Sequence, residues 1–206
     1  MLERIRFVKS IQKDYRIVLA SASPRRQELL SRVGLKYELK PSDCEEITDK
    51  LLPGDIVEEL SRIKAQAVAE TISSDNDKVV IIGADTVVAL DDKILGKPAD
   101  EADAFRMLKG LQGRSHSVFT GVTLIFMNNV DTNVVSFYEE TKVWMYPMDD
   151  EEIWEYIRTG EPMDKAGSYA VQGIFAAYIE RIEGDFNNVV GLPIAKVCRV
   201  LKHNQL

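Results

Sequence analysis

The chain has 206 residues, of which 45% are hydrophobic and 29% charged, and its formal net charge at pH 7 is −7. This length and composition can bury a substantial core, so we expect a single domain over residues 1–206, with 1–15 as an N-terminal extension. The acidic balance argues against a scaffold for a nucleic-acid polymer, and an anion site would have to be a local cationic cluster that suits a small ligand.

The cysteine and histidine content argues against a disulfide framework and a histidine-based zinc site. The chain has two cysteines, Cys44 and Cys198, and two histidines, His116 and His203, in no metal-binding spacing. No apolar stretch approaches the roughly 18 residues that span a bilayer, and the first 15 residues lack the pattern of a secretory signal. We therefore expect a cytoplasmic protein with no membrane partner.

Strands and helices alternate through the first half of the chain, which predicts an α/β fold. Residues 1–15 read either as a short helix packed on the body or as a frayed extension. The elements expected next are a strand at 17–20, a helix at 24–33 ended by Gly34, a strand at 37–40, a polar loop at 41–53 and a long helix at 55–72.

The remaining elements predict a mixed sheet with helices outside, forming one domain with two lobes. They are a buried central strand at 79–83, a hairpin of 87–90 with 94–95 around Asp91-Asp92, a helix at 100–111, two long antiparallel strands at 117–126 and 134–146, a helix at 149–159 ended by Gly160, a turn-rich segment at 161–173, and a final helix at 189–201 that continues after Pro193.

The first motif is the segment Ser21-Ala22-Ser23-Pro24-Arg25-Arg26, where a strand gives way to a helix. The N-terminus of a helix exposes unpaired N–H groups, which makes it a ready anion site. Two arginines in the first turn oppose the helix dipole unless an anion, such as a phosphate, lies there. The alternative is an ordinary solvated start of a helix.

The second motif is Gly83-Ala84-Asp85-Thr86, where we place Asp85 at the C-terminal end of an apolar strand. A carboxylate there can deprotonate a water or bind a divalent cation, although it can also simply cap a turn. Lys64 and Lys97 could add positive charge, but a helical lysine such as Lys64 more often lies on a solvated face. Glu46 could supply a second carboxylate to a metal, although Glu45-Glu46 also fits a solvated loop.

A third segment, Asp164 to Gly173, holds Gln172, whose amide both donates and accepts hydrogen bonds and could read the edge of a base. Several familiar motifs are absent from the sequence. It contains no G-x-x-x-x-G-K-[ST] phosphate loop, no G-x-G-x-x-G after the first strand and no G-x-S-x-G elbow.

Five motifs in order resemble those of the Maf family of nucleotide pyrophosphatases: S-x-S-P-R-R-x-E-L-L, G-A-D-T-V-V, L-G-K-P, D-K-A-G-x-Y-x-x-Q-G and N-V-V-G-L-P. The resemblance covers about residues 16–201. It implies a fold similar to that of inosine triphosphatases, with an elongated mixed sheet, flanking helices and two lobes around a nucleotide cleft. It also implies hydrolysis of nucleoside triphosphates to monophosphate and pyrophosphate with a divalent metal (Mg²⁺ or Mn²⁺), and a possible homodimer.

The resemblance is to the subgroup that acts on dTTP and UTP, because this chain has Arg25, Thr86 and Gln172 at the positions where that subgroup has arginine, threonine and glutamine. It implies Asp85 as the catalytic base and metal ligand, with Glu46 as a second ligand. The implied substrate-binding residues are Ser21, Arg25, Arg26, Lys64, Thr86, Lys97 and Gln172. One departure is the segment 185–188, Asp-Phe-Asn-Asn, which could alter the wall of the base pocket.

Two other functions remain open on the sequence alone. One is a nucleotide-binding regulator of cell division and septum formation that does not turn its ligand over. The other is a phosphatase that releases the γ-phosphate. All the charged residues that the resemblance implies for catalysis are present. This favours the pyrophosphatase, since a sensor has no need of a base beside the phosphoanhydride bond of its ligand.

Overall fold

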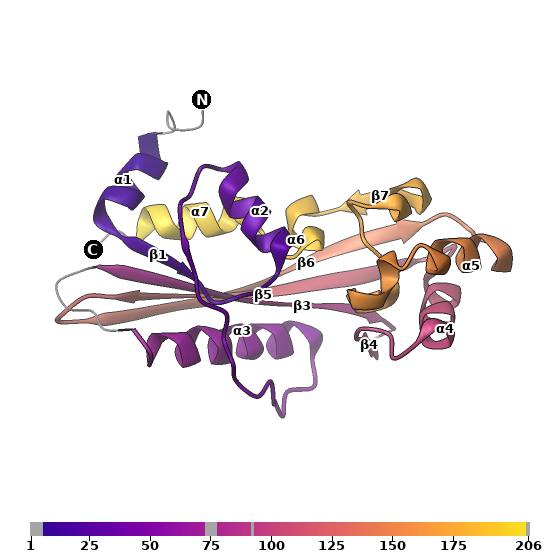
Figure 1. Ribbon diagram of the computed structural model, residues 1–206, viewed down its shortest axis with the longest axis horizontal. Helices are drawn as coiled ribbons and strands as arrows, with labels where there is room; N and C mark the ends of the chain where they lie inside the picture. The colour runs from indigo at the N-terminus through magenta and orange to yellow at the C-terminus, as the bar shows by residue number, and fades with distance from the viewer. Residues whose placement is uncertain (1–5, 73–77, 92, 205–206) are drawn as a thin grey trace.

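The structure, a computed structural model, describes residues 6–72, 78–91 and 93–204. In these ranges seven strands form one mixed sheet in the order β2-β1-β3-β5-β6-β7, and β4 pairs with β3. Helices lie outside the sheet, and the molecule is elongated along its longest strands (Figure 1). The predicted α/β class, with a mixed sheet flanked by helices, is confirmed.

The elements follow one another from the described N-terminus to the C-terminus with short connections, apart from the loop between β2 and α3. They are α1 (Arg6–Asp14), β1 (Arg16–Leu19), α2 (Pro24–Arg32), β2 (Glu38–Leu39), α3 (Pro53–Ala69), β3 (Val79–Leu90), β4 (Lys93–Leu95), α4 (Glu101–Leu111), β5 (Ser115–Met127), β6 (Thr132–Met145), α5 (Asp150–Arg158), the 3₁₀ helices η2 (Glu161–Asp164), η3 (Ala166–Ser168) and η4 (Ile174–Tyr178), β7 (Ile179–Glu183), α6 (Phe186–Val190) and α7 (Ile194–His203).

Helix α3 covers one face of the sheet, and α1, α2 and α7 cover the other (Figure 1). Two glycines allow α3 to lie directly on the strands. A Cβ at Gly121 would come within 2.0 Å of the carbonyl oxygen of Val57, and one at Gly83 within 2.3 Å of that of Ser61. This close approach is what brings Lys64, one turn further along α3, to the sheet.

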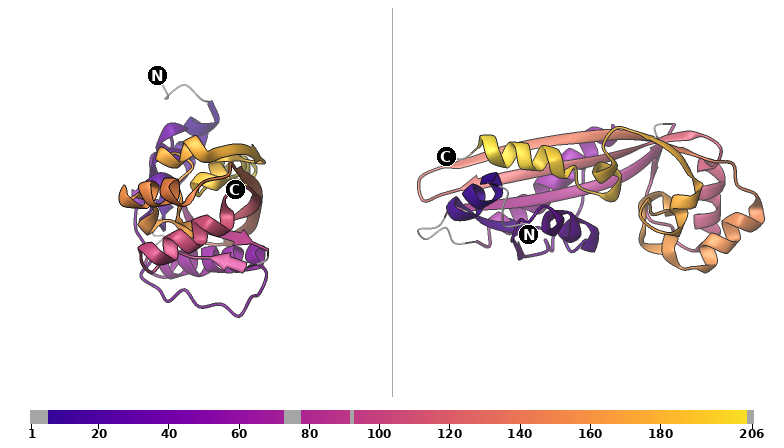
Figure 2. Two further views of the ribbon diagram at one scale, coloured as in Figure 1. Left: turned by 90° about the vertical axis from the view of Figure 1, so that its right-hand side faces the viewer. Right: turned by 90° about the horizontal axis from the view of Figure 1, so that it is seen from above.

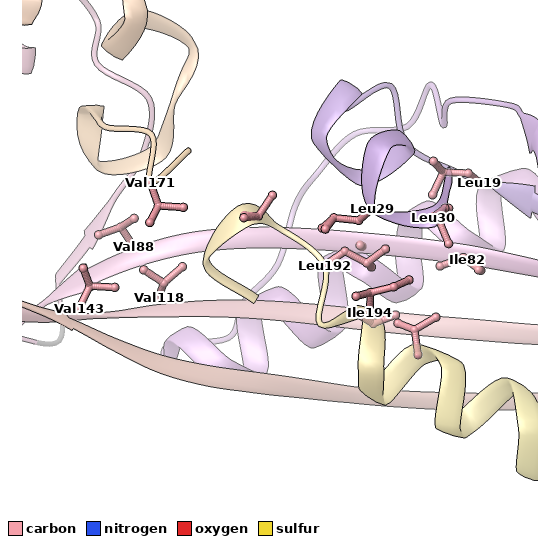
Figure 3. Close-up of a cluster of buried hydrophobic side chains, with 14 of the residues drawn as sticks. Leu19, Leu29, Leu30, Ile82, Val88, Val118, Val143, Val171, Leu192 and Ile194 are labelled. Carbon is pink, nitrogen blue, oxygen red and sulfur yellow. The ribbon is translucent and has the colours of Figure 1, made fainter. Parts of the chain in front are cut away.

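The long strands reach from this body into a second group of elements, made of α4, α5 and the 3₁₀ helices, at the far end of the molecule (Figure 2). One buried apolar cluster runs through both ends. Figure 3 shows Leu29, Leu30 and Ile82 in one part of it, and Val88 and Val171 in another. Burial of these side chains is the main force that holds the two ends together.

The N-terminal segment forms a packed helix over its described part. Val8 and Ile11 of α1 are 2% and 0% exposed and belong to the core cluster. The first of the two readings of the extension is therefore confirmed for residues 6–14, whereas residues 1–5 lie outside the described ranges. The hairpin of β3 and β4 is also confirmed, although Asp92 in its turn is outside those ranges.

The predicted end of the central strand is wrong. We expected the strand to end at Gly83 and Asp85 to follow it, but β3 continues without a break to Leu90. Its ladder with β5 runs from Val79 to Ala89, so the backbone has partners along the whole length. Asp85 therefore lies in the middle of a strand, and its carboxylate is bonded to Lys64 rather than capping a turn.

The C-terminal third also differs from the prediction. The single helix expected at 189–201 is divided into α6 and α7, because Gly191 adopts a φ of 122° and Pro193 follows it. The turn-rich segment predicted at 161–173 contains the 3₁₀ helices η2 and η3, whereas η4 and β7, which follow it, were not expected. None of the helices in the described part of the chain is long and apolar enough to cross a membrane.

Candidate functional site

The candidate site lies where strand β1 stops and β3 continues. The parallel pairing of these two strands ends at Leu19 and Ile82, and β4 joins β3 only at Val88. Between Ile82 and Val88 the same edge of β3 is not paired with a strand in the described part of the chain, and a cavity of about 480 Å³ lies over it. The end of a short parallel strand is a common place for a ligand crevice in α/β folds.

All the site residues predicted from the sequence line this cavity. They come from six separate stretches of the chain: Ser21, Arg25 and Arg26 from the end of β1 to the start of α2, Glu46 from the loop before α3, Lys64 from α3, Asp85 and Thr86 from β3, and Lys97 and Gln172 from two different loops at the far end. In total five cationic side chains and three carboxylates line it. The sheet edge thus collects charge that is scattered along the sequence.

Lys64 holds the two carboxylates of the cavity. Its Nζ lies 2.7 Å from Oδ1 of Asp85 and 2.8 Å from Oε2 of Glu46. The Lys64 and Asp85 side chains are 10% and 13% exposed, so Lys64 does not lie on a solvated face. Glu46 is 52% exposed, and its ion pair with Lys64 folds the acidic loop toward β3.

Asp85 and Glu46 also fit the predicted role of metal ligands. Both carboxylates converge on the same ammonium group, so they lie close enough to share a cation. Magnesium binds through one or two carboxylates together with phosphate oxygens rather than in an all-protein cage. The described residues contain no group of three or more acidic, histidine or cysteine side chains that could hold a metal ion.

The two adjacent arginines have different environments. Arg26 is 8% exposed and uses four of its five hydrogen-bond donors on Ser21 Oγ, Thr86 Oγ1 and the carbonyls of Ala84 and Gly191, at 2.8–3.0 Å. Burial lowers the pKa of Arg26, and the negative charge of Asp85 opposes this effect. Arg25 is half-buried and makes no hydrogen bond or ion pair with a described residue, so its guanidinium is available to a ligand.

Ser21 is positioned by its neighbours at the start of α2. Its Oγ accepts from Arg26 and, at 3.3 Å, from the backbone N–H of Ser23. Pro24 begins the helix, and Ser23 before it makes no side-chain cap to the first N–H groups. Those groups are the donors that an anion would satisfy.

Lys97 and Gln172 reach the cavity from its opposite side. Both are exposed, and neither side chain hydrogen-bonds to a described residue. Both side chains are therefore free to bind a ligand.

Two charged residues of the cavity were missed, although the sequence motif contained them. Asp164 and Lys165 lie in the 161–173 segment and form an ion pair, and Lys165 Nζ also donates to the carbonyl of Glu161 at 3.3 Å. The hydrogen bond from Lys165 lowers the pKa of Asp164, and the charge of Arg25 adds to this effect. Arg25 and Asp164 thus line the same cavity and interact electrostatically, which no local pattern could indicate.

Tyr169, also missed, forms part of the cavity wall and is supported from behind by His116. The Tyr169 hydroxyl lies 2.7 Å from Nε2 of His116, and the two side chains are 5% and 4% exposed. Burial lowers the pKa of His116 to about 4 and raises that of Tyr169. Both rings are therefore neutral near pH 7.

Fold and site together define an α/β protein that gathers cations around a carboxylate at an open sheet edge, which suits a small polyanion. The model of the Maf family, described as Maf-like protein, matches residues 16–204. The chain belongs to the Maf family, as the five motifs predicted.

Two curated relatives cover nearly the whole chain. The dTTP/UTP pyrophosphatase of Thermoanaerobacter sp. (strain X514) is 51% identical over 187 residues, which are 91% of this chain and 95% of that protein. The dTTP/UTP pyrophosphatase of Agathobacter rectalis is 50% identical over 196 residues, with 90% and 96% covered. Among solved structures, the Staphylococcus aureus Ham1 protein matches at 15% identity and a TM-score of 0.37, over 79% of this chain and 90% of that one.

Proposed function

We propose that this chain hydrolyses dTTP and UTP to the nucleoside monophosphate and pyrophosphate. Relatives that are about half identical to this chain over nine-tenths of its length are named dTTP/UTP pyrophosphatases. The observation that carries the proposal is the convergence of Asp85, Lys64 and the free cations Arg25 and Lys97 on one cavity. A base next to several cations is what cleavage of a polyphosphate requires.

Cations around the cavity would bind the triphosphate. Arg25 and Lys97 are free to do so from opposite sides of the opening. Ser21 and the backbone N–H groups at the start of α2 would hold one phosphate, with the positive end of the helix directed at it. Arg26, whose donors are mostly used, would add its charge and keep Ser21 in place.

The chemical step would be attack of a water on the α-phosphorus. Asp85 would take the proton as the new P–O bond forms and the bond to the bridging oxygen breaks, and pyrophosphate leaves with the electron pair. Lys64, which is within 2.7 Å of Asp85, would orient the carboxylate and neutralise charge on the leaving group.

A divalent metal would be held by Asp85 and Glu46, the two carboxylates that share Lys64. Bound there, it would supply charge stabilisation to the phosphate oxygens. Binding of Mg²⁺ to the protein without nucleotide, measured by calorimetry and compared with Glu46→Gln, tests this ligand set.

Three residues would favour a pyrimidine with a carbonyl at its fourth position. They are Arg25, Thr86 and Gln172, which line the same cavity although they are distant in sequence. Gln172 would read the base edge with its amide, since it is exposed toward the opening. The cytoplasmic location and the homodimer stay predictions.

The deciding experiment identifies the products. The protein is incubated with each ordinary nucleoside triphosphate and Mg²⁺ or Mn²⁺, and pyrophosphate and orthophosphate are measured separately. We expect pyrophosphate and monophosphate, with dTTP and UTP turned over fastest. Orthophosphate and a diphosphate would indicate the γ-phosphatase, and stoichiometric binding without product would indicate the non-catalytic regulator.

A further inference from the structure

A closed ring of hydrogen bonds lies beneath Thr86. Arg26 Nη2 donates to Thr86 Oγ1 at 3.0 Å, Thr86 Oγ1 lies 3.0 Å from Thr120 Oγ1, and the Thr120 hydroxyl donates to the carbonyl of Asn188 at 3.0 Å. Gly191 closes the ring: its N–H donates to the same carbonyl at 2.9 Å, and its own carbonyl accepts Arg26 Nε at 2.9 Å.

Only part of this ring can touch a ligand. Thr86 and Thr120 are directly opposite each other in the β3–β5 ladder. Thr86 is partly exposed and lines the cavity, whereas Thr120 and Asn188 are 0% exposed. Thr120 therefore does not touch a ligand itself, but its hydroxyl is bonded directly to that of Thr86, which does line the cavity.

The ring fixes the direction of every hydrogen bond in it. A carbonyl oxygen can only accept and a guanidinium can only donate. The Thr120 hydroxyl has one proton, which goes to Asn188, so the bond between the two threonines has to be donated by Thr86. Thr86 Oγ1 also accepts from Arg26, and it is left with a lone pair but no proton for a ligand.

We propose that Thr120 is a positioning residue that makes Thr86 a hydrogen-bond acceptor only, so that the site selects a base with an N–H donor at this point. The inference rests on the proposed function, in which Thr86 faces the base. Uracil and thymine carry N–H at ring position 3, where cytosine has a bare lone pair. The fifth donor of Arg26, on Nη2 beside Thr86, has no partner among residues 6–72, 78–91 and 93–204 and would serve an adjacent base carbonyl.

The test is Thr120→Val, which removes the hydroxyl at nearly constant volume. It releases the proton of Thr86, which can then point at N3 of cytosine. We expect the ratio of kcat/KM for UTP to that for CTP to fall by about tenfold. Because both substrates are measured on one sample, a loss of folded protein does not move this ratio, and Thr120→Ser should restore it.

Thr123→Val is the matched control. Thr123 is in the same strand and 0% exposed, and its hydroxyl bonds to Ser61 Oγ at 2.8 Å and Ser136 Oγ at 2.9 Å, outside the cavity. The Thr123→Val variant loses a buried hydroxyl, as Thr120→Val does, but the hydroxyl proton of Thr86 stays hydrogen-bonded to Thr120. We expect the UTP to CTP ratio to remain that of the wild type.

An unchanged ratio in Thr120→Val, or an equal change in Thr123→Val, would overturn the proposal. If Thr120→Val does not fold, Thr120→Ala removes the same hydroxyl. Wild-type protein gives a further test, since equal turnover of UTP and of 3-methyl-UTP, which lacks the N3 proton, would also refute it. Absence of pyrophosphate from any nucleotide would instead refute the proposed function.

Discussion

The two halves of strand β3 share one neighbour and differ in the other. Residues Val79–Ile82 lie between β1 and β5, and all of them are 0% exposed. From Gly83 to Val87 the strand keeps its pairing with β5 but has lost β1, and here Asp85 and Thr86 line the cavity. The first half is core and the second half is the floor of the site.

The difference teaches that the length of the neighbouring strand decides where the site opens. Beyond the end of β1, the carbonyl of Ala84 accepts a hydrogen bond from the side chain of Arg26 and not from the backbone of a neighbouring strand. A backbone position that would otherwise be part of a ladder thus anchors a side chain of the cavity. The sheet can carry charged groups at this point because one edge of β3 is open to solvent and ligand.

The largest effect is expected from a change in the second half of β3, at Asp85. Asp85→Asn keeps the shape of the side chain but removes the base and its charge, so we expect kcat to fall by about two to four decades. Steady-state release of pyrophosphate from UTP measures the change. By comparison, Ile82→Ala in the first half should cost about 2–5 kcal/mol of stability and leave kcat of the folded protein near that of the wild type.

Asp164→Asn is the matched control for Asp85→Asn, because it is the same change in the same cavity. The Asp164 side chain is 74% exposed and pairs with Lys165 rather than with Lys64. We expect its kcat to stay within a few-fold of the wild type. Equal losses in the two variants would mean that charge in the cavity, and not a base at Asp85, sustains turnover.

The boundary between the halves is tested by Gly83→Ala. The new Cβ would lie 2.3 Å from the carbonyl oxygen of Ser61, so α3 has to move away from the sheet and take Lys64 with it. We expect a loss of at least about 3 kcal/mol in the free energy of unfolding, measured in urea. Gly96→Ala is the control, because its Cβ would meet no atom within 4 Å; a similar loss there would contradict the steric argument.

The alternation of apolar and polar residues was sufficient to predict most of the fold. Helix α4 begins after the Asp100 cap and α5 after the Asp149 capping box, which are local signals. Local patterns could not show that β3 continues through Asp85, because the ladder with β5 that keeps it extended joins residues far apart in sequence. Strand β7 was missed because its pairing with β6 is equally remote.

The residues of the site were predicted more accurately than the extent of β3, the strand that carries Asp85 and Thr86. Every residue that the ordered motifs and the resemblance indicated for the site lines the cavity, although the local patterns of Lys64 and Glu46 alone favoured solvated positions. What each one contacts was not predictable. Arg25 and Arg26 look equivalent in the sequence. Tertiary packing buries Arg26 and leaves the guanidinium of Arg25 available to a ligand.

Acid should lower the stability of the protein through His116, which lies on β5 beside Tyr169. His116 is neutral in the folded protein because burial lowers its pKa to about 4, against 6.5 when unfolded. Between these values the unfolded chain binds the extra proton, so stability is lost as the pH falls from about 6.5 to about 4, by about 3 kcal/mol in total.

Urea unfolding at a series of pH values measures this loss. His116→Gln removes the titrating ring and should flatten the pH dependence in that window. If the slope persists in His116→Gln, other groups cause the acid sensitivity, and the support of Tyr169 by His116 is not its origin.

The smallest effect separates the two arginines. Arg26→Lys cannot reproduce four hydrogen bonds in three directions and leaves buried carbonyls unpaired, so we expect a loss of about 2–3 kcal/mol in stability. Arg25→Lys should change stability by no more than about 0.5 kcal/mol, because Arg25 has no partner in the described protein, while KM for UTP rises. Thermal unfolding and initial rates on both variants give the two numbers. If Arg25→Lys proved the more destabilising, the assignment of one arginine to the scaffold and the other to the ligand would be reversed.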